Sequence, residues 1–207
     1  MKKITKITLL CCVLLCFTHC KEKTKVAVET FEMTPEYAEK IDKPEVHFKV
    51  DIPKNLQFDK PVEGKKTSSY GMIQEKNDDG VVTEMYSFGY ISLDGMEFEK
   101  NARSFMVQIR DMLKRGGYKV DKHEIGMLPF DGEKYVSFQA TATMEEGKTP
   151  EFVGNYLFNA VVKPNPHGNT HIIMLMAARD DQNAVTYEDF KDKLAISTVW
   201  NTFKYLQ

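Results

Sequence analysis

Cysteine is the residue of this chain best suited to chemistry, and all four copies lie near the start, at Cys11, Cys12, Cys16 and Cys20. Clustered thiolates can bind a metal ion or carry out redox reactions. The surrounding sequence favours another role. Three lysines in the first six residues precede an apolar run over residues 7–17, and the chain becomes charged directly after Cys20. A positive start followed by a short apolar stretch is typical of an export signal, and the run is too short for a comfortable membrane-spanning helix.

The last four residues of this leader, Phe-Thr-His-Cys at positions 17–20, resemble the lipobox of bacterial lipoproteins. In that family Leu, a small or β-branched residue and then Gly, Ala or Ser precede the acylated cysteine. Thr18 fits this pattern, Phe17 replaces Leu with another apolar residue, and His19 departs from it. The resemblance implies cleavage before Cys20 and lipidation of Cys20. Two alternatives stay open: Cys16, which also follows apolar residues, as the lipidated position, and a signal that carries no lipid.

Cleavage at this position would change the chemistry and the charge of the chain. The exported part would hold no cysteine except Cys20, and therefore no disulfide, thiol nucleophile or thiolate metal site. The leader carries three of the 28 basic residues and none of the 30 acidic ones, so its removal leaves a formal charge of −5. Such mild acidity gives no reason to expect nucleic acid as a partner. Several acyl chains on Cys20 would anchor the protein stably, since each buried CH₂ contributes about 0.8 kcal/mol.

Histidine and methionine pairs could in principle bind metals. His167 and His171 are four residues apart, but a turn rich in Pro, Gly and Asn separates them instead of a helix. Met174 and Met176 share one face of an expected strand and could bind Cu(I), although filling the core is the more common role of methionine. We therefore expect no metal and no cofactor.

Acidic pairs are the remaining catalytic candidates. Glu145-Glu146 and Asp180-Asp181 are expected to be turn charges, because nothing places them in an apolar cleft where acid–base catalysis would be favoured. The sequence contains no phosphate-binding loop, zinc-binding helix motif or nucleophile elbow. We therefore expect that the protein is not an enzyme.

Two further sets of side chains could line a binding surface. One is an aromatic face that could hold a ligand but is more simply explained by a covering helix: Tyr86, Phe88 and Tyr90. The other is a polar strand face that could line a groove but is expected to face solvent: Ser137, Gln139, Thr141 and Thr143.

Hydrophobic periodicity places these residues on elements. Alternating patterns predict strands over residues 46–52, 70–75, 81–93, 118–125, 135–144, 155–163 and 170–179. An apolar stripe from Phe98 to Leu113 predicts a long helix that begins at a capping box at residues 94–97 and ends at Gly116-Gly117. A second helix is expected over residues 186–198. The strand at 170–179 is apolar on both faces and should lie centrally in the sheet.

This order predicts an α+β fold in which a single antiparallel sheet is flanked by two main helices. The expected organisation is a signal peptide at residues 1–19, a lipid-anchored tether at 20–44 and a globular domain at 45–207. The layout resembles the PsbP-like fold of photosystem II extrinsic proteins and of bacterial envelope lipoproteins such as the DcrB-like group. The features that carry the resemblance are residues 48–53, the long helix, the meander of strands and the spacing of Phe190, Leu194, Trp200 and Phe203.

The resemblance implies an α/β/α sandwich and a role in binding or assembly rather than catalysis. We expect a non-catalytic module of the bacterial cell envelope that meets the membrane through acyl chains on Cys20 and binds an envelope protein or a small ligand. Two alternatives stay open: a hydrolase with an unrecognised site, and a membrane-held inhibitor that neutralises a toxin.

Overall fold

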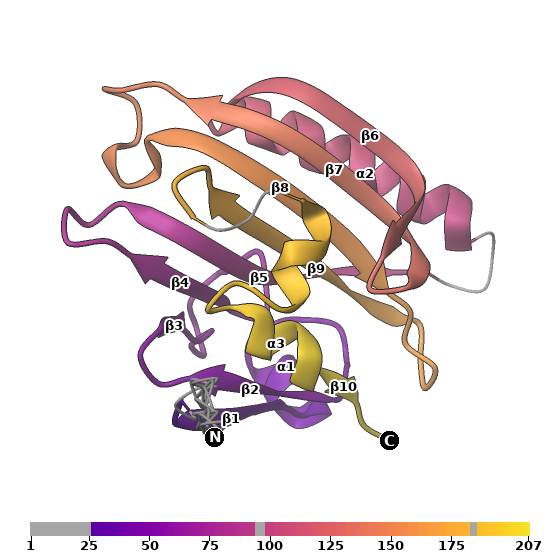
Figure 1. The fold of residues 1–207 in the computed structure, drawn as a ribbon. Helices are drawn as coiled ribbons and strands as arrows, with labels where there is room; N and C mark the ends of the chain where they lie inside the picture. Colours follow the sequence, from indigo (N-terminus) through magenta and orange to yellow (C-terminus); the bar gives the residue numbers. More distant parts are fainter. Residues whose placement is uncertain (1–25, 94–97, 183–185) are drawn as a thin grey trace, which may run out of the picture.

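The computed structural model describes residues 26–93, 98–182 and 186–207, and Figure 1 shows their arrangement. A three-stranded sheet has the order β1-β2-β10, and a seven-stranded sheet has the order β3-β4-β5-β9-β8-β7-β6, with all neighbours antiparallel. The strands are β1 Val28–Met33, β2 Phe48–Pro53, β3 Gln57–Asp59, β4 Met72–Lys76, β5 Val82–Ser92, β6 Lys119–Phe130, β7 Glu133–Met144, β8 Gly154–Lys163, β9 Thr170–Arg179 and β10 Lys204–Tyr205. The helices are α1 Pro35–Lys40, α2 Phe98–Arg115 and α3 Ser197–Thr202, with 3-10 turns η1 Pro150–Phe152 and η2 Tyr187–Lys191.

The two faces of the large sheet are covered by different layers, as Figure 1 shows. On one face lies α2, which buries Ala102, Met106, Ile109 and Leu113. On the other face lie the small sheet and the C-terminal segment with η2 and α3. Side chains of β5 alternate between the two cores. Tyr86 and Phe88 belong to the core beneath the small sheet, and Ile91 belongs to the core beneath α2.

Most expected strands are confirmed, and β9 is the central strand of the large sheet, as its apolar sequence predicted. The helix at residues 98–115 is confirmed as α2, whereas its expected capping box at 94–97 lies outside the described residues. The turn between β6 and β7 is Asp131-Gly132, where both residues have positive φ angles of 52° and 77°. This is the backbone that an Asp-Gly hairpin favours.

The expectation of a single sheet was wrong, because β1, β2 and β10 form a second sheet of their own. The expected tether at residues 20–44 was also too long. Within that range β1 and α1 are part of the folded domain and bury Phe31, Met33 and Ala38. These apolar side chains are too thinly spaced to reveal a core strand and helix from the sequence alone.

The expected second main helix at residues 186–198 was wrong as well. The segment forms the 3-10 turn η2 and the short helix α3, with an irregular link between them. The reason is the spacing of the residues that face the core. Leu194 and Ile196 are both buried. In a helix, however, side chains two positions apart point in directions about 200° apart and cannot share one face. Breaking the helix lets both side chains enter the core.

Candidate ligand groove beside helix α2

The residues singled out for metal chemistry lie at a turn and in the core. The Nδ1 atom of His171 accepts a hydrogen bond from the backbone N–H of Asn165 at 2.9 Å, so this side chain closes a turn. Met174 and Met176 are fully buried in the core beneath the small sheet. Among the described residues, no three His, Cys, Asp or Glu side chains gather closely enough to hold a metal ion. Cys20 lies outside the described residues.

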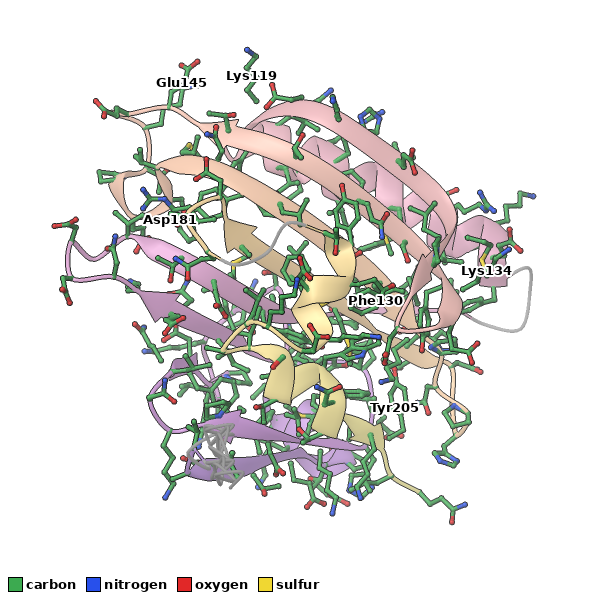
Figure 2. All side chains as sticks on the ribbon, viewed as in Figure 1. Lys119, Phe130, Lys134, Glu145, Asp181 and Tyr205 are labelled. Atoms are coloured by element: carbon green, nitrogen blue, oxygen red, sulfur yellow. The ribbon has the colours of Figure 1, made fainter. Side chains whose placement is uncertain are left out.

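The acidic pairs stay at the surface. Glu145 and Glu146 are exposed in the turn that follows β7, and Figure 2 shows Glu145 pointing away from the body of the molecule, near the outward-pointing Lys119. Asp180 accepts a hydrogen bond from the side-chain amide of Asn155 at 2.9 Å. Neither pair lies in a cleft that would favour acid–base chemistry.

The expected solvated strand face of β7 was wrong in part. Ser137 is fully buried and Gln139 is 6% exposed, because η2 and the C-terminal segment lie over this part of the sheet. The aromatic face of β5 is covered too, since Tyr86 and Phe88 are fully buried. What covers it is the small sheet and α3 instead of a long helix. Neither face is therefore a binding surface.

One buried acid has a strongly shifted pKa. Burial raises the pKa of the Glu84 carboxyl to about 7, opposed by hydrogen bonds from the backbone N–H groups of Ile196 and Ala195. These bonds measure 3.0 Å and 3.2 Å and end on the two different oxygens. Both oxygens hold the backbone ahead of α3, so Glu84 has a structural role.

The surface hollow of greatest interest lies on the opposite face of the sheet, beside α2. This helix packs over β6 and β7 and leaves part of β5 and β9 open. The floor of the hollow comes from these two strands: Ser87 and Gly89 of β5 are paired with Leu175 and Ile173 of β9. Because Gly89 has no side chain, the floor is low at this point. The hollow holds about 360 Å³, within the size range of small-ligand pockets.

The walls of this first hollow are mainly apolar. Helix α2 contributes Phe105, Ile109 and Met112. Tyr90 also borders the hollow, but its ring packs against Tyr70 on the other face of the sheet. Met112 is 46% exposed, which is unusual for a large apolar side chain within the stripe of an amphipathic helix. The apolar stripe of α2 is thus wider than the area that packs on the sheet, and its uncovered edge forms one wall.

A second hollow of about 320 Å³ adjoins the first, and both are lined by Ser87, Met112 and Leu175. Its walls carry three further methionines, Met72, Met85 and Met144, together with aromatic residues. Methionine is flexible and polarisable, so a surface rich in it adapts to apolar ligands of different shapes. We call the two adjoining hollows the α2 groove.

The polar groups of the α2 groove carry one formal charge, that of Arg115 in the last turn of α2. Within the described part of the chain, no hydrogen bond or ion pair engages the side chains of Arg115, Gln108, Ser68 or Ser87. The nearby acid Asp111 is engaged by Arg110 instead, at 2.9 to 3.0 Å. The groove therefore offers an apolar floor, one unpaired cation and several free hydrogen-bonding groups.

Sequence reasoning missed this groove because five separate segments build it. Two signals in the sequence point to it in retrospect. Gly89 stands inside a strand of large residues, where glycine often marks the close approach of another group. Met112 belongs to a stripe that is broader than one sheet contact requires.

The sequence matches no known protein-family model, and no curated protein is significantly similar to it. Among solved structures, the chain is similar to the cyanobacterial PsbP protein of Synechocystis, with 13% identity and a TM-score of 0.49 over 92% of this chain and 99% of that one. It is also similar to the Ran-binding protein Mog1p of Saccharomyces cerevisiae, with 11% identity and a TM-score of 0.39 over 86% and 96%. At these values the similarity says nothing about what the domain binds.

Proposed function

We propose that this chain is a lipoprotein of the bacterial cell envelope whose domain binds a ligand in the α2 groove without catalysing a reaction. The observation that carries the binding role is the groove itself, with its apolar floor and its unpaired Arg115. The ionisable residues that line it are Arg115, Tyr90 and Tyr118. Burial raises the pKa of Tyr118 above its usual value, so this phenol stays protonated near neutral pH and is unsuited to act as a general base.

The membrane attachment rests on the leader and the lipobox-like residues that end at Cys20. No helix among the described residues is long and apolar enough to cross a bilayer. Acyl chains on Cys20 would supply an anchor of their own, because two or more chains exceed the requirement for stable membrane attachment. The first described residue, Val26, is only six positions from Cys20, so the anchor and the folded domain would lie close together.

Metabolic labelling with an alkyne-tagged palmitate in a bacterial host tests this attachment. We expect the wild-type chain to incorporate the label and to sediment with membranes. Cys20→Ala should lose both properties, and Cys16→Ala, the matched control, should keep them. Label that persists in Cys20→Ala would overturn the assignment of Cys20, and loss in Cys16→Ala alone would move the anchor to Cys16.

A further inference from the structure

We propose that the α2 groove binds a single-chain amphiphile with an anionic head group, such as a long-chain carboxylate. This inference rests on the proposed binding role of the groove and specifies its ligand. It commits to a small amphiphile because the concavity consists of two adjoining hollows of about 320 and 360 Å³, both lined by Ser87, Met112 and Leu175. Adjoining apolar hollows of this size suit one flexible chain.

The tail of the ligand is matched by the floor and by the second hollow. Gly89 leaves space above β5, and Leu175 and Met112 line both hollows. The second hollow adds Met72 and Met85 with other apolar side chains. Burying the CH₂ groups of an acyl chain there is favourable, and flexible methionines can adjust to chains of different length.

The head group is matched by the polar rim of the first hollow. Arg115 has no ion-pair partner among the described residues, and a guanidinium can bind both oxygens of a carboxylate. Gln108 and Ser68 line the same hollow and can donate further hydrogen bonds. None of the described acidic residues lines either hollow, so a cationic head group would find no partner among them.

The chain's own anchor is not the occupant that we infer. The described chain begins just before β1, which lies in the small sheet. That sheet packs on the face of the large sheet that carries Tyr86 and Phe88, whereas the groove opens on the face that carries Ser87 and Gly89. An acyl chain on Cys20 would thus start from the opposite side of the large sheet.

Photolabelling of the full chain in lipid nanodiscs tests the proposal. A diazirine analogue of dodecanoate is the probe, and mass spectrometry of the digested protein locates the label. We expect label on residues that line the groove, displaced by excess dodecanoate and much less by dodecyltrimethylammonium. Label spread over other surfaces, or equal displacement by the cationic amphiphile, would overturn the proposal. Displacement by lysophosphatidylglycerol would show that a lipid headgroup can replace the free carboxylate.

Variants separate the two ends of the ligand. Gly89→Leu should abolish groove labelling because its side chain fills the floor; a Cβ at this position meets Ile173 at an ordinary 3.5 Å, so the strand should tolerate it. Arg115→Gln should raise the dodecanoate concentration needed for displacement by about two- to fivefold, the range expected for one exposed charge pair. Lys114→Gln, on the same turn of α2 but outside the groove lining, is the matched control and should behave as wild type. Unchanged labelling in both Gly89→Leu and Arg115→Gln would refute the site.

The anchoring variant keeps this test independent of the membrane attachment. Cys20→Ala should retain groove labelling even where it loses palmitate. Loss of palmitate labelling without loss of groove labelling supports both lipidation of Cys20 and amphiphile binding in the groove. An acylated protein whose groove takes no label would support the lipidation and refute the amphiphile binding.

Discussion

The carboxylate of Glu84, on strand β5, accepts the backbone N–H of Ile196 at 3.0 Å and thereby fixes the C-terminal segment to the large sheet. The carboxylate is 3% exposed, and its pKa is raised to about 7 by burial. In the unfolded chain its pKa would be near 4.5. The folded state therefore binds the proton more tightly than the unfolded state does.

This difference makes the stability dependent on pH. Protonated Glu84 therefore stabilises the folded state, and this contribution is complete below the pKa of the unfolded chain, near 4.5. The contribution is lost as the pH rises through about 7. The shift corresponds to roughly 3 kcal/mol between these limits. Glu84→Gln removes the ionisation and keeps one acceptor, so we expect it to stabilise the protein by about 1–2 kcal/mol at pH 8 after a lost hydrogen bond is counted.

Urea unfolding at pH 5 and pH 8 measures this effect. Near pH 5 the variant should be no more stable than wild type, because the buried carboxyl is then largely protonated. Glu75→Gln, which changes a neighbouring carboxylate on β4 whose charge raises the pKa of Glu84, should give a smaller effect of the same sign. A wild-type protein that gains stability between pH 5 and pH 8 through Glu84 would contradict the prediction.

A second prediction concerns Asn159 in the middle of β8. Its side chain is fully buried, and neither amide atom has a hydrogen-bond partner within the described ranges. Leaving buried polar groups unpaired costs about 1–3 kcal/mol. Asn159→Leu, which has a similar volume, should raise the free energy of unfolding by about 1–2 kcal/mol in chemical denaturation. Asn155→Leu on the same strand is the control and should give no gain, since Asn155 is exposed and bonded to Asp180. A clear loss in Asn159→Leu would indicate that bound water holds the amide.

A third prediction concerns the hydroxyl of Tyr205, which accepts the backbone N–H of Ile172 and donates to the backbone carbonyl of Lys163, both at 2.7 Å. Tyr205 thus joins the small sheet to the ends of β8 and β9 (Figure 2 labels it). Tyr205→Phe leaves both backbone groups without this partner, and we expect a loss of about 1–3 kcal/mol in thermal or urea unfolding. Tyr187→Phe, another half-buried tyrosine, should cost less. Equal stability of Tyr205→Phe and wild type would mean that water replaces the hydroxyl.

The elements with strong periodicity could be predicted from the sequence. The aromatic face of β5 was assigned correctly because Tyr86, Phe88 and Tyr90 stand at alternate positions, and side chains alternate between the two faces in any antiparallel sheet. The helix α2 was found because its stripe repeats over several turns. The hydrophobic pattern of a strand or helix predicts its buried face well where a single layer of structure covers that face.

The remaining features depend on contacts between distant segments. The helix expected at residues 186–198 is broken where Glu84, about 110 positions earlier, accepts backbone N–H groups. The α2 groove could not be predicted for a similar reason. It exists because α2 leaves part of β5 and β9 uncovered, and no local sequence pattern indicates how far a helix extends across a sheet. The second strand that pairs with β2, β10, is likewise missed because it has only two residues, Lys204–Tyr205, and is too short for any periodicity.

That short strand has a consequence for how the chain folds. β10 pairs with β2, and the Thr202 hydroxyl accepts the backbone N–H of Asp51 across 151 positions of sequence. Contacts between such distant segments are slow to form, because a long loop must close before they contribute any stability. The small sheet cannot be completed until Lys204 and Tyr205 have emerged, so a chain still in synthesis would keep this layer open. If the leader at residues 1–19 acts as the export signal that we propose, delayed closure would prolong the unfolded state in which the chain can be threaded across a membrane.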